Sequence, residues 1–158
     1  MDDDIAQLCT RRSTLKQQGL FSDAISLQLQ ILDTTQRHGE IKEISNAWNY
    51  LSSLYYHIGS FVDAEYASRR SIEVYHLQPE PVDEVVACYE LLLARSLMAQ
   101  DNYDDAVVYG VAAVNHYSTF HDPPDDFLRG VQQHVNMMME LRDRQNSNAG
   151  RADNPPQP

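Results

Sequence analysis

The sequence predicts an all-α protein, and three features carry this prediction. In the middle of the 158-residue chain, apolar residues recur every three or four positions, which places them on one face of a helix; they are Trp48, Leu51, Tyr55 and Ile58. The turn that follows, residues 59–64, recurs around Ala24 and Ala106, so that its alanines are 40 and 42 residues apart. Gly39 follows the first such unit, and prolines follow the second and the third. A repeat of this length indicates a stack of helical hairpins.

Six helices, paired into three hairpins, are predicted along residues 5–39, 44–80 and 82–120. In the first hairpin, three aspartates after Met1 favour a helix start and Gly19 supplies the turn. In the second, Gly59 ends one helix and Ser60 is placed to cap the next. Pro81 is placed to open the third hairpin, in which Asp101 replaces the glycine of the turn.

A seventh helix is predicted over residues 124–145. Its apolar positions lie on one face: Phe127, Leu128, Val131, Val135, Met138 and Leu141. Because a stack of repeats cannot bury its last face alone, we expect this helix to cap it. Of the three methionines at 137–139, only one or two can face the stack. Residues 146–158 contain almost nothing apolar and are predicted to be a disordered tail, which leaves one helical domain over residues 1–145.

Composition favours a soluble globular protein and argues against some ligands. The chain is 42% hydrophobic and 22% charged, with a formal net charge of −11. This acidity argues against binding nucleic acid or an anionic membrane through general electrostatics, although acidity also simply keeps a protein soluble. The acidic start and the lack of a long apolar run lead us to expect a cytoplasmic protein. Cys9 and Cys88 stand alone, without the spacing of a zinc site or a disulfide framework.

No catalytic pattern emerges, so we predict a protein that is not an enzyme and needs no cofactor or metal. None of the six histidines has another four residues away, and there is no Walker loop, GxGxxG or GxSxG motif. Acidic pairs such as Asp104 and Asp105 fall at predicted helix starts, where the helix dipole explains them. The two cysteines could act as nucleophiles only beside a base; buried or groove-lining thiols are the alternative.

The second hairpin resembles the tetratricopeptide repeat family. Six signature positions of that family are occupied at the family's spacing: Trp48, Leu51, Tyr55, Gly59, Phe61 and Ala64. Trp48 is predicted to be the largest core residue of this hairpin. Ser52 stands where glycine or alanine is usual, and Pro79 comes later than in the 34-residue repeat. The period near 42 is similar to the longer repeats of kinesin light chain and related adaptors.

The resemblance implies a right-handed α-solenoid of three helix-turn-helix repeats plus the capping helix. It also implies a protein-interaction module or adaptor, because the first helices of the repeats line a concave groove that binds a peptide segment of a partner. By register, the candidate groove residues are Ser13, Lys16, Asn46, Asn49, Ser53, Tyr56, Arg95 and Met98, with Cys9, Gln17, His57, Cys88 and Leu91 beside them. Asparagines at 46 and 49 could hydrogen-bond a peptide backbone, and Arg95 could hold a carboxylate. The alternative is that these are ordinary solvated side chains.

The resemblance leaves the class of partner open. One possibility is a peptide from a larger assembly; another is a secreted or assembly-prone protein for which the chain is a small dedicated chaperone, as the three-repeat chaperones of type III secretion are. Those chaperones are similar in size and acidity but carry the 34-residue period. The C-terminal tails of the major heat-shock chaperones are not expected, because the residues that grip them are replaced here by Cys9, Ser13, Tyr50, Cys88 and Leu92. Association into a homodimer also stays open.

Overall fold

The computed structural model of the chain describes residues 2–80, 82–119 and 126–152. Within these residues the protein has seven helices and no strand, which confirms the predicted all-α class. The helices are α1 (Asp2–Gln17), α2 (Phe21–His38), α3 (Ile41–His57), α4 (Phe61–Tyr75), α5 (Asp83–Met98), α6 (Tyr103–Ser118) and α7 (Asp126–Ala152). The predicted opening of the third hairpin by Pro81 and the predicted start of the seventh helix at residue 124 concern residues outside the described ranges. None of the described helices combines the length and the hydropathy that crossing a membrane requires.

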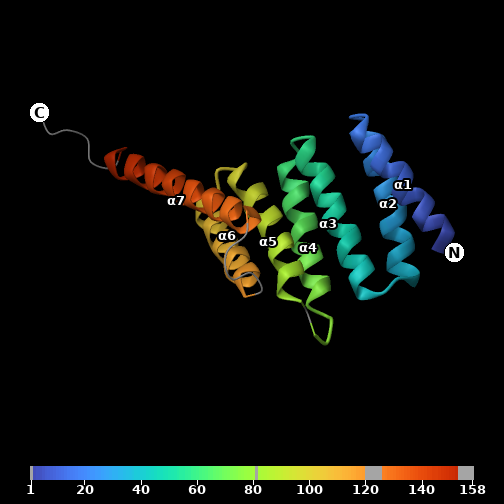
Figure 1. The fold of residues 1–158 in the computed structure, drawn as a ribbon. Helices are drawn as coiled ribbons and strands as arrows, with labels where there is room; N and C mark the ends of the chain where they lie inside the picture. Colours follow the sequence, from blue (N-terminus) through green and yellow to red (C-terminus); the bar gives the residue numbers. More distant parts are fainter. Residues whose placement is uncertain (1, 81, 120–125, 153–158) are drawn as a thin grey trace, which may run out of the picture.

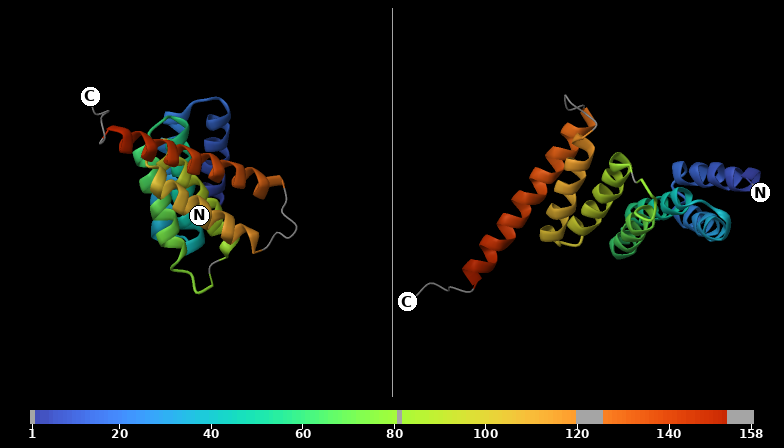
Figure 2. Two further views of the ribbon diagram at one scale, coloured as in Figure 1. Left: turned by 90° about the vertical axis from the view of Figure 1, so that its left-hand side faces the viewer. Right: turned by 90° about the horizontal axis from the view of Figure 1, so that it is seen from below.

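The helices pack in chain order, each against the one before and after it, and together they form an elongated row (Figure 1). Short turns join α1 to α2, α3 to α4 and α5 to α6, so these pairs are antiparallel hairpins. The N-terminus lies at one end of the row, and α7 leans across the other end and projects beyond it (Figure 2). Helix α3 also contacts α5.

The three hairpin turns share one backbone geometry. Gly19, Gly59 and Asp101 adopt left-handed φ values of 75°, 79° and 59°. In each turn, the next residue's N–H donates to a carbonyl five residues back, at 2.9 Å (Leu20 to Leu15), 3.0 Å and 3.1 Å. This hydrogen bond satisfies a carbonyl that the helix end leaves free. The predicted glycine stops are thereby confirmed, and aspartate takes the same conformation in the third turn.

Ser60 does not cap α4 through its side chain, so that prediction is wrong. The residue occupies the N-cap position, but its hydroxyl makes no capping hydrogen bond, and its backbone carbonyl accepts from the N–H of Ala64 at 2.9 Å instead. In the third hairpin the equivalent Asn102 accepts from the N–H of Asp105. The turns are therefore fixed mainly by backbone hydrogen bonds.

The hairpin interiors follow the predicted register. The three equivalent alanines, Ala24, Ala64 and Ala106, are completely buried. In each hairpin, the residue twelve positions before the alanine pairs with the residue four positions after it. These pairs are Arg12 with Gln28 in the first hairpin and Ser52 with Ser68 in the second. Both pairs are joined by hydrogen bonds of 2.6 Å, and the third pair is Ala94 and Gly110, which are buried as well. The same position in the hairpin thus holds a large polar pair, a small polar pair and a small apolar pair.

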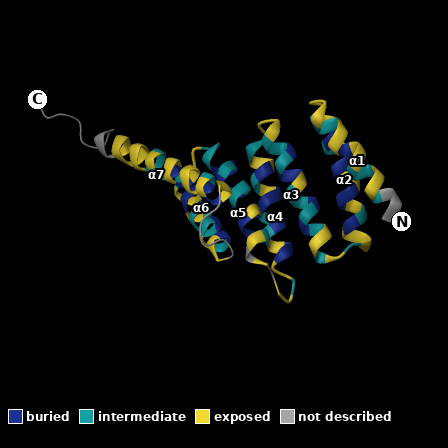
Figure 3. Cartoon of the chain, viewed as in Figure 1, coloured by how far each residue is buried: buried dark blue, intermediate teal, exposed yellow. Residues whose placement is uncertain are grey.

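Two residues that were expected in the core, Trp48 and Ile58, are not buried there. Trp48 is only half-buried: its ring meets Tyr66 edge-on at 5.9 Å, and the guanidinium of Arg70 lies 5.9 Å from the ring centre. Ile58 is 45% exposed, because it follows the last residue of α3 and points away with the turn. The centre of the second hairpin is instead built on fully buried Leu51 and its neighbours, as Figure 3 shows along the facing sides of the helices.

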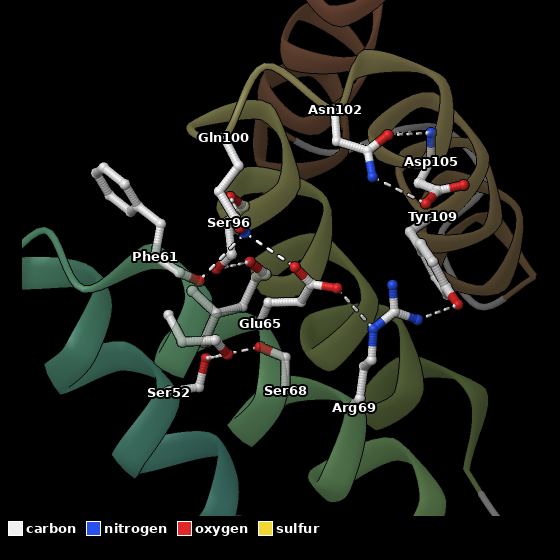
Figure 4. A network of polar contacts seen from close by, with 12 residues as sticks. Ser52, Phe61, Glu65, Ser68, Arg69, Ser96, Gln100, Asn102, Asp105 and Tyr109 are labelled. Carbon is white, nitrogen blue, oxygen red and sulfur yellow. Dashed lines mark hydrogen bonds and ion pairs between the residues drawn. The ribbon is translucent and has the colours of Figure 1, made fainter.

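A polar network joins the second hairpin to the third (Figure 4). The side-chain amide of Gln100 donates to Glu65 at 2.9 Å and to the carbonyls of Ser96 and Phe61 at 3.1 and 3.3 Å. The other carboxylate oxygen of Glu65 accepts from Arg69 at 2.9 Å, and Arg69 also donates to the hydroxyl of Tyr109 at 2.9 Å. The network links α4 to α5 and α6, and it was not predicted.

Helix α7 covers the last hairpin with a face of four buried residues, Leu128, Val131, Val135 and Met138. Gly110 of α6 permits this contact, because a Cβ there would lie 2.9 Å from a methyl group of Val135. Phe127 stays largely exposed, although its ring packs on Tyr117 at 4.8 Å. Residues 146–152 were predicted to be disordered, but α7 continues to Ala152. Residues 153–158 lie outside the described ranges.

Candidate functional site

The C-terminal ends of α1, α3 and α5 bring predicted groove residues together. The ammonium group of Lys16, near the end of α1, donates to the hydroxyl of Ser53 on α3 at 3.3 Å. The guanidinium of Arg95, near the end of α5, lies 5.1 Å from the ring centre of Tyr56 on α3. Three helices that are separate in sequence therefore contribute to one surface. We call its residues, Lys16, Ser53, Tyr56 and Arg95, the basic cluster.

The pKa of His57 reflects the positive charge of this surface. Its pKa is lowered, first by partial burial and then by the positive charges of Lys16 and Arg95. Both cations therefore lie close enough to disfavour the protonated imidazole. At neutral pH the ring is uncharged, and it stacks on Phe21 with the ring centres 5.5 Å apart.

The two cations of the basic cluster, Lys16 and Arg95, form no ion pair with any residue that the structure describes. Among the described residues, no carboxylate oxygen lies within 4 Å of the charged nitrogens of Lys16 or Arg95. Most of the other arginines differ, since Arg37, Arg69, Arg70, Arg129, Arg142 and Arg144 each face an aspartate or glutamate. In a chain with a net charge of −11, these two cations are available to an external anion.

Apolar surface borders the basic cluster on two sides. Phe21 and Phe61, the first residues of α2 and α4, pack on His57 and Tyr56 with ring centres 5.5 Å apart in both pairs. Beyond Arg95, a hollow of about 290 Å³ opens between α5 and α7. Its lining consists of Leu91, Arg95, Asp126, Phe127, Gly130, Val131 and His134. The α7 residues of this hollow were missed, although an exposed phenylalanine in a predicted capping helix could have indicated them.

The other predicted groove residues lie apart from the basic cluster. Asn46 accepts a 2.7 Å hydrogen bond from the hydroxyl of buried Tyr89, so its amide oxygen already has a partner in α5. The amide oxygen of Asn49 is shielded from solvent and has no hydrogen-bond partner among the described residues. Ser13 is exposed and donates to the carbonyl of Cys9 in its own helix, and Met98 packs against the interior of the third hairpin.

The remaining histidine, cysteine and carboxylate side chains that the structure describes do not form a metal site. In the described part of the chain, no three histidine, cysteine or carboxylate side chains are placed to hold a metal ion. Cys88 is exposed, but partial desolvation raises the pKa of its thiol and the charge of Glu84 raises it further, so this thiol is protonated at neutral pH. The arrangement at the basic cluster suits non-covalent recognition of an acidic group beside apolar side chains.

No protein-family model matches this sequence, and no curated protein matches it significantly. The likeness to tetratricopeptide repeats therefore rests on the residue pattern of the hairpins and stays a prediction.

Proposed function

We propose that this chain is a tetratricopeptide-like right-handed solenoid of three repeats and a capping helix, and that it acts as an adaptor. Its ligand is an acidic peptide segment of a partner protein, bound without catalysis or cofactor where α1, α3 and α5 end. Shared turn geometry and buried alanines at spacings of 40 and 42 residues support the architecture. One observation carries the function: Lys16 and Arg95 gather around Ser53, Tyr56 and His57, and neither has a carboxylate partner among the described residues.

The neighbouring surface defines the peptide more closely. A carboxylate held by Arg95 would lie beside the hollow that Leu91, Phe127 and Val131 line. An apolar side chain next to the acidic residue can enter that hollow and remove its surface from water. We therefore propose a ligand in which aspartate or glutamate neighbours a bulky apolar residue.

The test is binding of capped peptide pools, measured by fluorescence anisotropy with the full-length chain. Three pools of equal length combine leucine and phenylalanine with glutamate, glutamine or lysine. We expect the glutamate pool to bind most tightly and the Lys16→Glu/Arg95→Glu variant to lose about tenfold or more of that affinity, because each new carboxylate repels the ligand.

The matched control is Lys42→Glu/Arg144→Glu, which changes the net charge equally. Lys42 lies at the opposite end of α3, and Arg144 lies in the exposed part of α7. We expect this variant to bind the glutamate pool nearly as the wild type does. Equal losses in both variants, or a preference for the lysine pool, would contradict the proposed function.

A further inference from the structure

Arg12 is a buried cation that forms no ion pair with a side chain described in the structure. Only 6% of its surface is exposed, and no carboxylate oxygen of a described residue lies within 4 Å of its guanidinium. Burying a charge is unfavourable unless an opposite charge or hydrogen bonds compensate for it. The hairpin itself does not require this side chain, because the equivalent residues of the other two hairpins are Ser52 and Ala94.

The guanidinium is held in one orientation. One of its nitrogens donates to the side-chain oxygen of Gln28 at 2.6 Å, and the amide nitrogen of Gln28 donates to the carbonyl of Ala47 at 2.7 Å. Its central carbon lies 3.9 Å from the ring centre of Tyr50. A guanidinium has five N–H groups, and this one makes no other hydrogen bond to a described residue. Arg12 therefore presents oriented donors that the fold leaves unused.

A hollow of about 220 Å³ lies beside these donors, between α1, α2 and α3. Its walls are Ile5, Cys9, Arg12, Gln28, Ile31, Thr35, Glu43, Asn46, Ala47 and Tyr50. The carboxylate of Glu43 already accepts from the N–H of Glu40 at 3.0 Å, and seven residues, or about 10 Å along a helix, separate Glu43 from Tyr50. The hollow thus has the guanidinium of Arg12 and the carboxylate of Glu43 in its lining, more than 4 Å apart, and an apolar wall at Ile5, Ile31 and Ala47.

We propose that this hollow is a second binding site, whose ligand is a carboxylate on a short branched apolar stem. The carboxylate accepts from the free N–H groups of Arg12, and the stem packs against the isoleucines. Such a group occurs as a free carboxylic acid, and a glutamate side chain of a partner protein offers the carboxylate on a similar short stem. The site shares no residue with the basic cluster, so the two proposals can be tested independently.

The first experiment uses the wild-type chain and two probes of nearly equal shape, 4-methylpentanoate and its neutral amide. Binding is followed by NMR of the arginine side-chain N–H groups. We expect the acid to shift the Arg12 signal and to bind about tenfold more tightly than the amide, because only the acid carries a negative charge that attracts the guanidinium. Equal binding of acid and amide, or shifts at other arginines without one at Arg12, would overturn the proposal.

Variants test the same site independently. Arg12→Gln should abolish acid binding, whereas Arg11→Gln, which alters an exposed neighbour on α1, should leave it unchanged. Lys16→Glu/Arg95→Glu should also retain acid binding, which separates this site from the basic cluster. Circular dichroism checks that each variant is folded. If Arg12→Gln does not fold, the shift of the Arg12 signal in the wild-type chain decides whether the acid binds at this site.

The source of the carboxylate is distinguished with capped pentapeptides that carry a single central glutamate or glutamine. Tighter binding of the glutamate peptide than of the free acid assigns the site to a partner protein, and the reverse order assigns it to a small acid. Both results support the site. Failure of both probes to bind refutes it.

Discussion

At the scale of single residues, the three hairpin turns pose the same conformational demand and meet it differently. Gly19 and Gly59 reach positive φ without strain, because glycine has no Cβ. Asp101 adopts φ 59° with a side chain, which is unfavourable for an L-residue although aspartate tolerates it better than most. Its carboxylate accepts a 2.7 Å hydrogen bond from the hydroxyl of Tyr103, which partly compensates.

Substitutions in these turns should therefore have opposite effects. Gly59→Ala should lower the free energy of unfolding by about 1 kcal/mol, since no atom lies within 4 Å of the added Cβ and only backbone strain remains. Asp101→Gly should raise it by about 0.5 kcal/mol. Urea unfolding measures both. A change of the same sign in the two variants would show that the turns are not equivalent.

The same substitution offers a second readout at Tyr103. The hydrogen bond to Asp101 is the largest cause of the raised pKa of that phenol. In Asp101→Gly the pKa should fall back toward its ordinary value, which an ultraviolet titration of the tyrosines can follow. Tyr103→Phe is the matched control for the titration, because it removes this phenol and leaves the signals of the other tyrosines in place.

At the scale of helices, α7 illustrates how one amphipathic element closes the row. Its apolar face reaches only as far as the α6 surface that it covers, and residues 143–149 are exposed although helical. The three successive methionines differ in burial accordingly: Met138 is completely buried, Met139 is half-buried and Met137 is 41% exposed. Only one of them therefore contributes a full core contact.

This difference predicts the effects of truncating each methionine. Met138→Ala should lower the free energy of unfolding by about 2–4 kcal/mol, because it leaves a cavity between α6 and α7. Met137→Ala should change it by less than about 0.5 kcal/mol. Chemical denaturation of the two variants compares them directly. Similar losses would mean that α7 is rotated from the position described above.

At the scale of the whole molecule, the net negative charge destabilises the folded state. The chain has 23 acidic and 12 basic residues spread over a thin row of helices, so most charges lie near solvent. Mutual repulsion of the excess carboxylates destabilises the folded state and is weakened by salt. The basic cluster is a local exception to this acidic surface.

Raising the concentration of sodium chloride from 10 to 300 mM should therefore raise the melting temperature, because the Debye length falls from about 30 Å to below 10 Å over this range. The Lys16→Glu/Arg95→Glu variant, which is four charges more negative, should show a steeper rise. Potassium chloride is the control, since screening depends on ionic strength and not on the cation. A melting temperature independent of salt would refute this account.

Much of the fold and part of the site follow from the sequence by itself, because the relevant signals are local. Spacing of apolar residues sets the helices, and a glycine two residues before an aromatic residue marks the first two turns, with Asp101 in place of the glycine in the third. Register then places Lys16, Ser53, Tyr56 and Arg95 on the first helices of successive hairpins. These inferences need only the geometry of one helix and one turn, which neighbouring residues determine.

Contacts between helices were decided only by the tertiary structure. Periodicity gives the buried face of a helix but not the distance or rotation of its neighbour, so it could not pair Arg12 with Gln28 or Asn46 with Tyr89. For the same reason it predicted Trp48 to be the largest core residue of its hairpin, whereas the ring is only partly buried and packs against the edge of the cluster that contains Leu51. Which polar side chains find partners, and which cations stay unpaired, depends on packing between residues far apart in the chain, and that packing defines both candidate sites.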